Sequence, residues 1–187
     1  MSRIYVILAL TLGSATAFAA PVDRCDQIVA YQLQNGFNGN TVASFGNQYD
    51  VGTCAGTPMA PWLPASGAAF EQVVKLRVAA SCTLNVSMTG QASGGNLNDP
   101  APYLASTCPI AGAGTTQMLD TSCLASADQT GQLGTESFSV SLVPATDYYL
   151  YLDGFLDAQG PYLVTMSGCT LVDGAASPLV FSNGFEG

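Results

Sequence analysis

The sequence predicts an all-β protein, an antiparallel β-sandwich with a jelly-roll-like arrangement of strands, held by disulfide bonds. Two observations predict the sandwich: short segments alternate apolar and polar residues with a period of two, and clusters of turn residues separate them. A third observation argues against the helical classes, because no long stretch combines helical periodicity with capping residues. Many short strands divided by turns are typical of sandwiches and jelly rolls.

The alternation begins in the middle of the chain. Glu71–Val78 places Val74 and two further apolar residues on one face, and Cys82–Met88 repeats the pattern with Asn85 and Ser87 on its outer side. Such alternation is typical of strands that bury one face of an antiparallel sheet. The glycine pair that follows, at positions 94 and 95, favours a tight turn.

Further strands are predicted in the C-terminal half, at Glu136–Leu142, Tyr148–Asp153 and Tyr162–Ser167. The turns between them are predicted at Pro144–Asp147 and Asp157–Gly160. The tyrosines of the second segment fall on both faces of one strand, which favours core packing and cross-strand pairing over a ligand site. Only Asp26–Leu33, directly after Cys25, is predicted to form a short helix.

Composition excludes several classes of function. The chain has 187 residues, with 13 acidic and 4 basic side chains, no histidine and a formal net charge of −9. The absence of histidine excludes Ser-His-Asp triads, Cys-His pairs and histidine-ligated zinc. The acidic excess argues against a nucleic-acid partner, which needs clustered basic residues. A hydrophobic content of 48% is too high for a disordered chain.

Residues 1–19 are predicted to be a secretory signal peptide. Arg3 precedes the apolar stretch Ile4–Leu12, and Ala17-Phe18-Ala19 supplies the small residues of a cleavage site after Ala19. The alternative is an N-terminal membrane anchor, but the apolar stretch is shorter than the ~20 residues that a spanning helix needs. We therefore expect a secreted protein, either extracellular or retained in the periplasm or at the cell surface, with no integral membrane segment after cleavage.

An even number of cysteines in an exported protein predicts disulfide bonds. The six are Cys25, Cys54, Cys82, Cys108, Cys123 and Cys169. Six cysteines allow 15 pairings, among which the sequence does not choose. We expect Cys25 with Cys54 and Cys108 with Cys123, each closing a local loop, and Cys82 with Cys169. A metal cluster is the alternative, but no pair has C-x-x-C spacing.

The C-terminal half combines four features in order: a strand at Glu136–Val143, a turn at Pro144–Asp147, a strand that opens with Tyr148-Tyr149 and ends with Asp153-Gly154, and Gly160-Pro161-Tyr162 before the final strand. This order resembles the last hairpins of bacterial pre-peptidase C-terminal domains. Upstream, Phe70–Val74 is similar to the family's opening strand, and Cys108 with Cys123 to its central cysteine-bounded segment. The similarity spans residues 24–169.

The resemblance implies a secreted β-sandwich that accompanies extracellular hydrolases as an accessory or surface-binding module. It divides the chain into an N-terminal extension with the first strands (20–65), a sandwich core (66–170) and a C-terminal tail (171–187). One departure concerns calcium. Many cysteine-rich members carry acidic residues directly after the second central cysteine, whereas the first acid after Cys123 is Asp128.

Two groups of acidic residues are candidate sites. Asp120-Thr121-Ser122 resembles the signature of aspartic proteases, which need two such carboxylates; a single copy would require a dimer, and a turn beside Cys123 is the alternative. Asp153 and Asp157, with Gly154 between them, are candidate calcium ligands among the scattered loop acids Asp99, Asp128, Asp153 and Asp157. The alternative is ordinary solvated turn acids, in which case no cofactor is needed.

Trp62 is a candidate binding residue in the apolar loop Met59–Pro64, because an exposed tryptophan can stack on a sugar or anchor a partner. The alternative is that it folds back to cover an edge of the sandwich. The tail, Ser177–Gly187, resembles the Gly-Phe-Glu endings of exported proteins from some gamma-proteobacteria. It is interpreted either as a sorting signal or as an apolar edge strand.

The sequence therefore predicts an exported, non-catalytic module that binds an extracellular or cell-surface ligand, either a glycan or a protein. One alternative is a hydrolase that uses carboxylates alone, like a glycosidase or an aspartic protease. Another is a secreted structural or inhibitory protein. Because fold alone does not determine function, the choice depends on the site.

Overall fold

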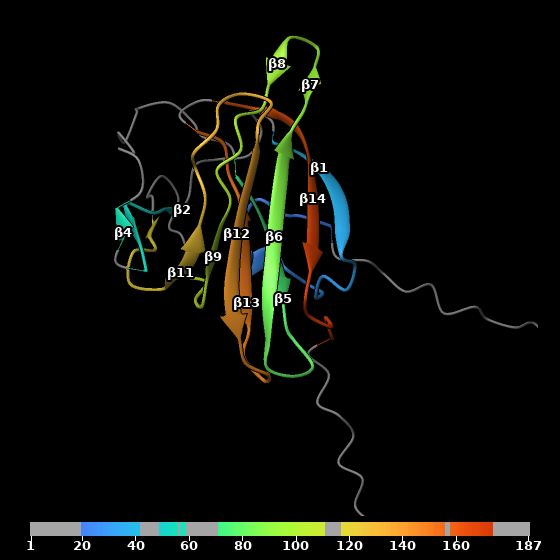
Figure 1. The fold of residues 1–187 in the computed structure, drawn as a ribbon, viewed down its shortest axis with the longest axis vertical. Helices are drawn as coiled ribbons and strands as arrows, with labels where there is room; N and C mark the ends of the chain where they lie inside the picture. Colours follow the sequence, from blue (N-terminus) through green and yellow to red (C-terminus); the bar gives the residue numbers. More distant parts are fainter. Residues whose placement is uncertain are drawn as a thin grey trace, which may run out of the picture.

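The structure is a computed structural model that describes residues 20–41, 49–55, 57–58, 71–110, 117–155 and 158–173 (Figure 1). Two four-stranded antiparallel sheets form a sandwich, which confirms the predicted fold class. The first sheet has the order β1 (Gly36–Thr41), β14 (Gly160–Ser167), β6 (Cys82–Gly90), β12 (Thr135–Leu142). The second has the order β11 (Cys123–Ser126), β9 (Tyr103–Ala105), β13 (Tyr148–Leu152), β5 (Gln72–Leu76).

The pairing of these strands is that of a jelly roll. Counted in chain order, the first sandwich strand pairs with the last, β1 with β14, and the second with the seventh, β5 with β13. The third pairs with the sixth, β6 with β12, and the fourth with the fifth, β9 with β11. This is one long antiparallel hairpin wrapped into two sheets, which places the two halves of the chain side by side throughout.

The core lies between the sheets and follows from the period-two alternation. Each strand directs every second side chain inward, so Leu84, Val86 and Met88 of β6 are buried while the residues between them face outward. Leu150 of β13 and Val164 of β14 meet them in the same cluster. The predicted alternation of β6, β12 and β14 therefore holds residue by residue.

A second apolar cluster lies on the outer face of the second sheet. That face presents Val73, Tyr103 and Tyr151, and it is overlaid by residues 20–33, 49–55 and 117–122, which we call the cover. Val22 bridges to Val73 at the edge of β5. Tyr151 packs between the rings of Tyr49 and Tyr103, with centroids 5.0 and 4.9 Å away. The predicted core role of the strand's tyrosines is thus confirmed.

Three short ladders complete the described structure. The parallel pair β2 (Tyr49–Asp50) and β10 (Gln117–Met118) lies in the cover, as does the start of the pair β3 (Thr53–Cys54) and β4 (Thr57–Pro58). The pair β7 (Ala92–Ser93) and β8 (Asn96–Leu97) forms a hairpin that projects beyond β6 (Figure 1). Gly94 and Gly95 join these two strands with φ of 60° and 88°, which confirms the predicted tight turn.

All six cysteines are paired, but two of the expected pairings are wrong. Cys82 joins Cys169 as expected. Cys25 joins Cys108 and Cys54 joins Cys123, in place of the expected local loops. The cause is the cover: residues 20–33 and 49–55 fold back over the second sheet, so their cysteines meet the segments after β9 and at the start of β11. All three bonds therefore connect distant parts of the chain.

The short helix predicted at Asp26–Leu33 is also wrong. Only Cys25–Gln27 forms one turn of 3₁₀ helix, which ends where Ile28 adopts an extended backbone. Beyond it the chain runs along β5, where Tyr31 bridges to Lys75 and the Gln32 N–H donates to the Lys75 carbonyl oxygen. Sheet pairing in the cover thus replaces the helix. Across the described part of the chain, no helix has both the length and the apolar character needed to span a bilayer.

Candidate functional site

The outer face of the first sheet, here called the open face, is built from small uncharged side chains. Its polar members are Asn38 and Asn40 of β1, Thr165 and Ser167 of β14, Thr83, Asn85, Ser87 and Thr89 of β6, and Thr135, Ser137, Ser139 and Ser141 of β12. Gly36, Pro161 and Leu163 occupy the other outward positions. No acidic or basic residue lies on this face of the four described strands.

The antiparallel register aligns these side chains in rows that run across the strands. One row is Ser139, Asn85 and Ser167, and the next is Ser137, Ser87 and Thr165. Between the two rows lies a row of core residues, Phe138, Val86 and Met166, whose side chains point inward. The rows follow from the alternation of each strand and from a register without slips between β6 and its two neighbours.

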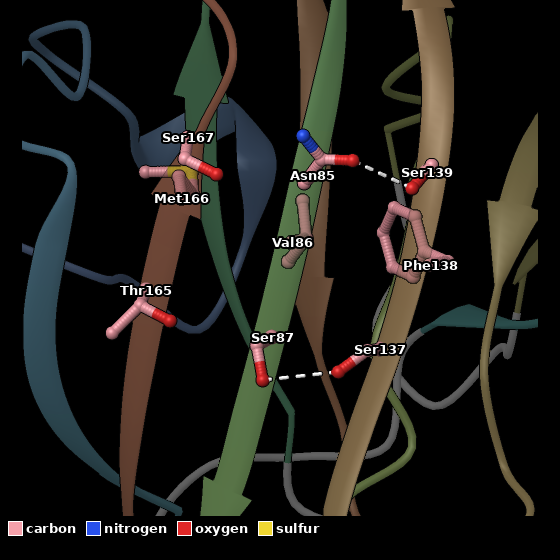
Figure 2. Close-up of a pocket in the computed structure, with 9 residues that line it drawn as sticks. All are labelled: Asn85, Val86, Ser87, Ser137, Phe138, Ser139, Thr165, Met166 and Ser167. Atoms are coloured by element: carbon pink, nitrogen blue, oxygen red, sulfur yellow. Dashed lines mark hydrogen bonds between the residues drawn. The ribbon is translucent and has the colours of Figure 1, made fainter.

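A shallow depression of about 380 Å³ lies over these rows (Figure 2). All nine of its lining residues belong to the three rows: Asn85, Val86, Ser87, Ser137, Phe138, Ser139, Thr165, Met166 and Ser167. Figure 2 shows the two polar rows on either side of the Met166, Val86 and Phe138 row, so the depression runs across β14, β6 and β12. Its sides are hydroxyl and amide groups.

Cross-strand hydrogen bonds hold the polar side chains of the depression in place. Ser137 Oγ donates to Ser87 Oγ at 3.0 Å, and Ser139 Oγ donates to Asn85 Oδ1 at 2.7 Å (Figure 2). Among the described residues, no acceptor takes a hydrogen bond from the Asn85 amide nitrogen. These bonds fix side-chain orientation while they leave hydroxyl lone pairs and an amide donor toward solvent.

The positive charges of the described residues lie elsewhere and are neutralised. Arg24 pairs with Asp26 at 2.7 Å within the cover. Lys75 Nζ lies 2.8 Å from Asp147, and Arg77 contacts the other oxygen of the same carboxylate. Burial disfavours the charged form of Asp147, but hydrogen bonds that include those from Lys75 and Arg77 outweigh it and lower the pKa of that carboxyl.

Three carboxylates interact at the end of the sandwich that carries β7 and β8. Glu136, only 2% exposed, points inward from β12, and its Oε1 accepts hydrogen bonds from Thr130 Oγ1 at 2.6 Å and from two backbone N–H groups. Burial, then the charges of Glu136 and Asp99, raise the pKa of Asp128 to about 6. Burial, then Glu136, also raises the pKa of Asp99. Within the described residues no group of His, Cys, Asp or Glu converges closely enough to hold a metal ion.

The acidic residues predicted as site candidates do not lie on the open face. Asp120 Oδ1 accepts the N–H groups of Gly52 at 2.6 Å and Thr53 at 3.0 Å, which ties the predicted turn beside Cys123 to residues 49–55 within the cover. Asp153 is fully buried after β13, and its Oδ1 accepts the N–H of Gly154. Asp157 lies outside the described residues, so the calcium interpretation of this pair stays a prediction.

Trp62, the Met59–Pro64 loop, residues 1–19 and the Ser177–Gly187 tail also lie outside the described residues, and their proposed roles stay predictions. The open face was not predicted as a site. Its signal was present, because Ser137, Ser139 and Ser141 alternate with apolar residues and no charge interrupts them. That pattern was used to predict a strand, and only the register shows that three such strands are adjacent.

No family model and no curated protein matches the chain. Among solved structures, it is similar to the pre-peptidase C-terminal domain of a collagenase from Bacillus anthracis. The match covers 72% of this chain and 90% of that domain, with 12% sequence identity and a TM-score of 0.43. A similarity of that size carries no argument about function, so the fold class rests on the two sheets themselves and family membership stays a prediction.

Proposed function

We propose that the chain is an exported, non-catalytic module that binds an extracellular ligand on its open face. The observation that carries the proposal is the difference between the two outer faces of the sandwich. One is overlaid by the cover, whereas the other presents an ordered, uncharged array of hydroxyl and amide groups. A sheet face without charge is unusual for a solvent-facing surface, because exposed positions normally carry Lys, Arg, Asp and Glu.

Two further features support the proposal. All six cysteines form disulfides, which persist in oxidising compartments outside the cytosol. The chain has no histidine, which removes the commonest general base and nucleophile activator. A binding module without catalytic activity works by bringing a surface or a partner enzyme into contact with the ligand that the module binds.

Retention on insoluble polymers tests the proposal. The purified protein is incubated with cellulose, chitin, peptidoglycan and collagen, and the bound fraction is measured. We expect at least one polymer to retain the wild type, and the open-face variant Asn38→Glu/Ser87→Glu to lose that retention. The control, Ser81→Glu/Thr121→Glu, adds the same charge at exposed positions elsewhere and should bind like the wild type. No retention on any polymer, or equal retention of both variants, contradicts the proposal.

One observation favours a second function, carboxylate-only hydrolysis. The pKa of Asp128, about 6, suits a general acid near neutral pH, and the charge of the Glu136 carboxylate, which accepts a hydrogen bond from Thr130, contributes to raising it. The test is an assay of chromogenic glycosides between pH 5 and pH 7. Hydrolysis that Asp128→Asn and Glu136→Gln both abolish supports this function. No hydrolysis, or activity that survives both substitutions, contradicts it.

A further inference from the structure

We propose that the depression binds one chain of a linear, uncharged polysaccharide, laid across β12, β6 and β14. The inference rests on the proposed function, in which the open face holds the ligand, and it adds the chemical class and the direction of that ligand. Three observations carry it: the shape of the depression, the chemistry of its sides, and the side chains that the open face lacks.

The shape fits a linear polymer. The two polar rows are two residues apart along each strand, which separates them by about 6.7 Å, and they extend over three strands, or about 10 Å between the outer strand axes. The depression is open at both ends of the row formed by Ser137, Ser87 and Thr165. At one end β12 is the edge strand of the sheet, and at the other the row continues to Gly36, which pairs with Thr165.

The sides of the depression match sugar hydroxyl groups. A sugar hydroxyl both donates and accepts hydrogen bonds, and the serine and threonine hydroxyls of the two rows do the same. The Asn85 amide adds a donor in the middle of the site. Because Ser87 and Asn85 are already oriented by Ser137 and Ser139, binding needs little ordering of protein side chains.

The missing charges select against other polymers. Anionic polysaccharides and nucleic acids need cations at the site, but the open face has none, and Arg24, Lys75 and Arg77 are paired with carboxylates elsewhere. Protein-binding surfaces are enriched in aromatic residues and arginine and depleted in serine, which is the reverse of this face. A small molecule would be bound in a deeper and more apolar pocket.

The composition also predicts weak binding per site. No aromatic side chain is exposed among the described strands of the open face, so the stacking that strengthens most sugar sites is absent. We expect dissociation constants in the millimolar range for short chains. Affinity should rise with chain length until the oligosaccharide spans the three strands, and then level off.

The experiment is an NMR titration of the ¹⁵N-labelled protein with cello- and N-acetylchito-oligosaccharides of increasing length. We expect amide shifts centred on Asn85 and Ser87. Ser137→Arg should weaken binding about tenfold or more, because the arginine fills one side of the depression. The matched control, Ser141→Arg, places the same change on the same strand and face but outside the depression, and should bind like the wild type. Thr165→Arg, on another strand, replaces Ser137→Arg if that variant misfolds.

The outcomes separate this inference from the proposed function. Shifts on the open face with collagen peptides or polygalacturonate, and none with neutral chains, overturn the polysaccharide inference and leave the open face as the binding surface. Equal weakening by Ser137→Arg and Ser141→Arg places the ligand elsewhere on the face and overturns the inference in the same way. If no polymer shifts any open-face amide, both fail.

Discussion

The two outer faces of the sandwich are built by the same alternation but end in opposite environments. On the second sheet, the outward side chains are large and apolar, and the cover buries them under two disulfide bonds. On the first sheet, the outward side chains are small and polar, and the depression lies open over them. An outward side chain of the second sheet therefore contributes to the stability of the fold, whereas an outward side chain of the first sheet contributes almost nothing to it. The difference assigns stability to the covered side and leaves the open face available for binding.

The largest expected effect comes from the covered face. Tyr151→Ala removes a fully buried ring that packs against Tyr49 and Tyr103, and it should lower the free energy of unfolding by about 4 kcal/mol. Urea denaturation measures the loss. Thr165→Ala, at an outward position of the open face, should change it by less than about 0.5 kcal/mol. Similar losses for the two variants would abolish the distinction between the faces.

The next largest effect is expected from removing a disulfide bond that joins the cover to the sandwich. Cys25→Ser/Cys108→Ser removes the bond that holds residues 20–33 on the second sheet, and it should cost about 3 kcal/mol. Hydrogen exchange should accelerate in residues 20–33 more than in β6 and β14. Equal acceleration in all three segments would mean that the cover and the sandwich unfold as one unit.

A smaller effect concerns the three carboxylates at the end of the sandwich that carries β7 and β8. Folding raises the pKa of Asp128 to about 6, so the folded state binds more protons than the unfolded chain. Stability should therefore rise as pH falls through about 6 and level off near the unfolded value of about 4. Asp128→Asn should stabilise the protein at pH 7 by about 1 kcal/mol, after allowance for solvent screening, and should flatten this dependence.

Thermal unfolding between pH 4 and pH 7 measures that effect. Thr121→Ala, at an exposed turn position away from the three carboxylates, serves as the control and should keep the pH dependence of the wild type. A stability that rises between pH 4 and pH 7 in the wild type would contradict the assignment of the raised pKa to Asp128.

The smallest effect is expected on the open face itself. Ser87→Ala/Ser137→Ala removes one exposed cross-strand hydrogen bond and should change the free energy of unfolding by less than about 0.5 kcal/mol. Chemical denaturation checks this value. A loss of several kcal/mol would show that the hydroxyl rows are structural, and would remove the reason to assign them to binding.

Local patterns determined what could be predicted from the sequence. The alternation in residues 82–88 and 136–142 predicted two strands and their outward faces, because strand periodicity is local. The pairing of Cys25 with Cys108 could not be predicted, since it depends on how the cover folds over the second sheet. The same holds for the depression: Asn85, Ser139 and Ser167 are far apart in sequence, and only the register brings them into one row. The interaction of the acids at 99, 128 and 136 could not be predicted either, because it depends on how two loops lie against β12 in the folded chain.

The jelly-roll pairing has a consequence for the order of events during biogenesis. Gly36 pairs with Thr165, so the first sandwich strand finds its neighbour only after more than 120 further residues have been synthesised. Until then β6 also lacks β14, and the last cysteine, Cys169, lies beyond that strand. Folding dominated by such distant contacts is slow. Neither the first sheet nor the Cys82–Cys169 bond can therefore be completed before residues 160–169 have left the ribosome, so closure of the sandwich is a late event in folding.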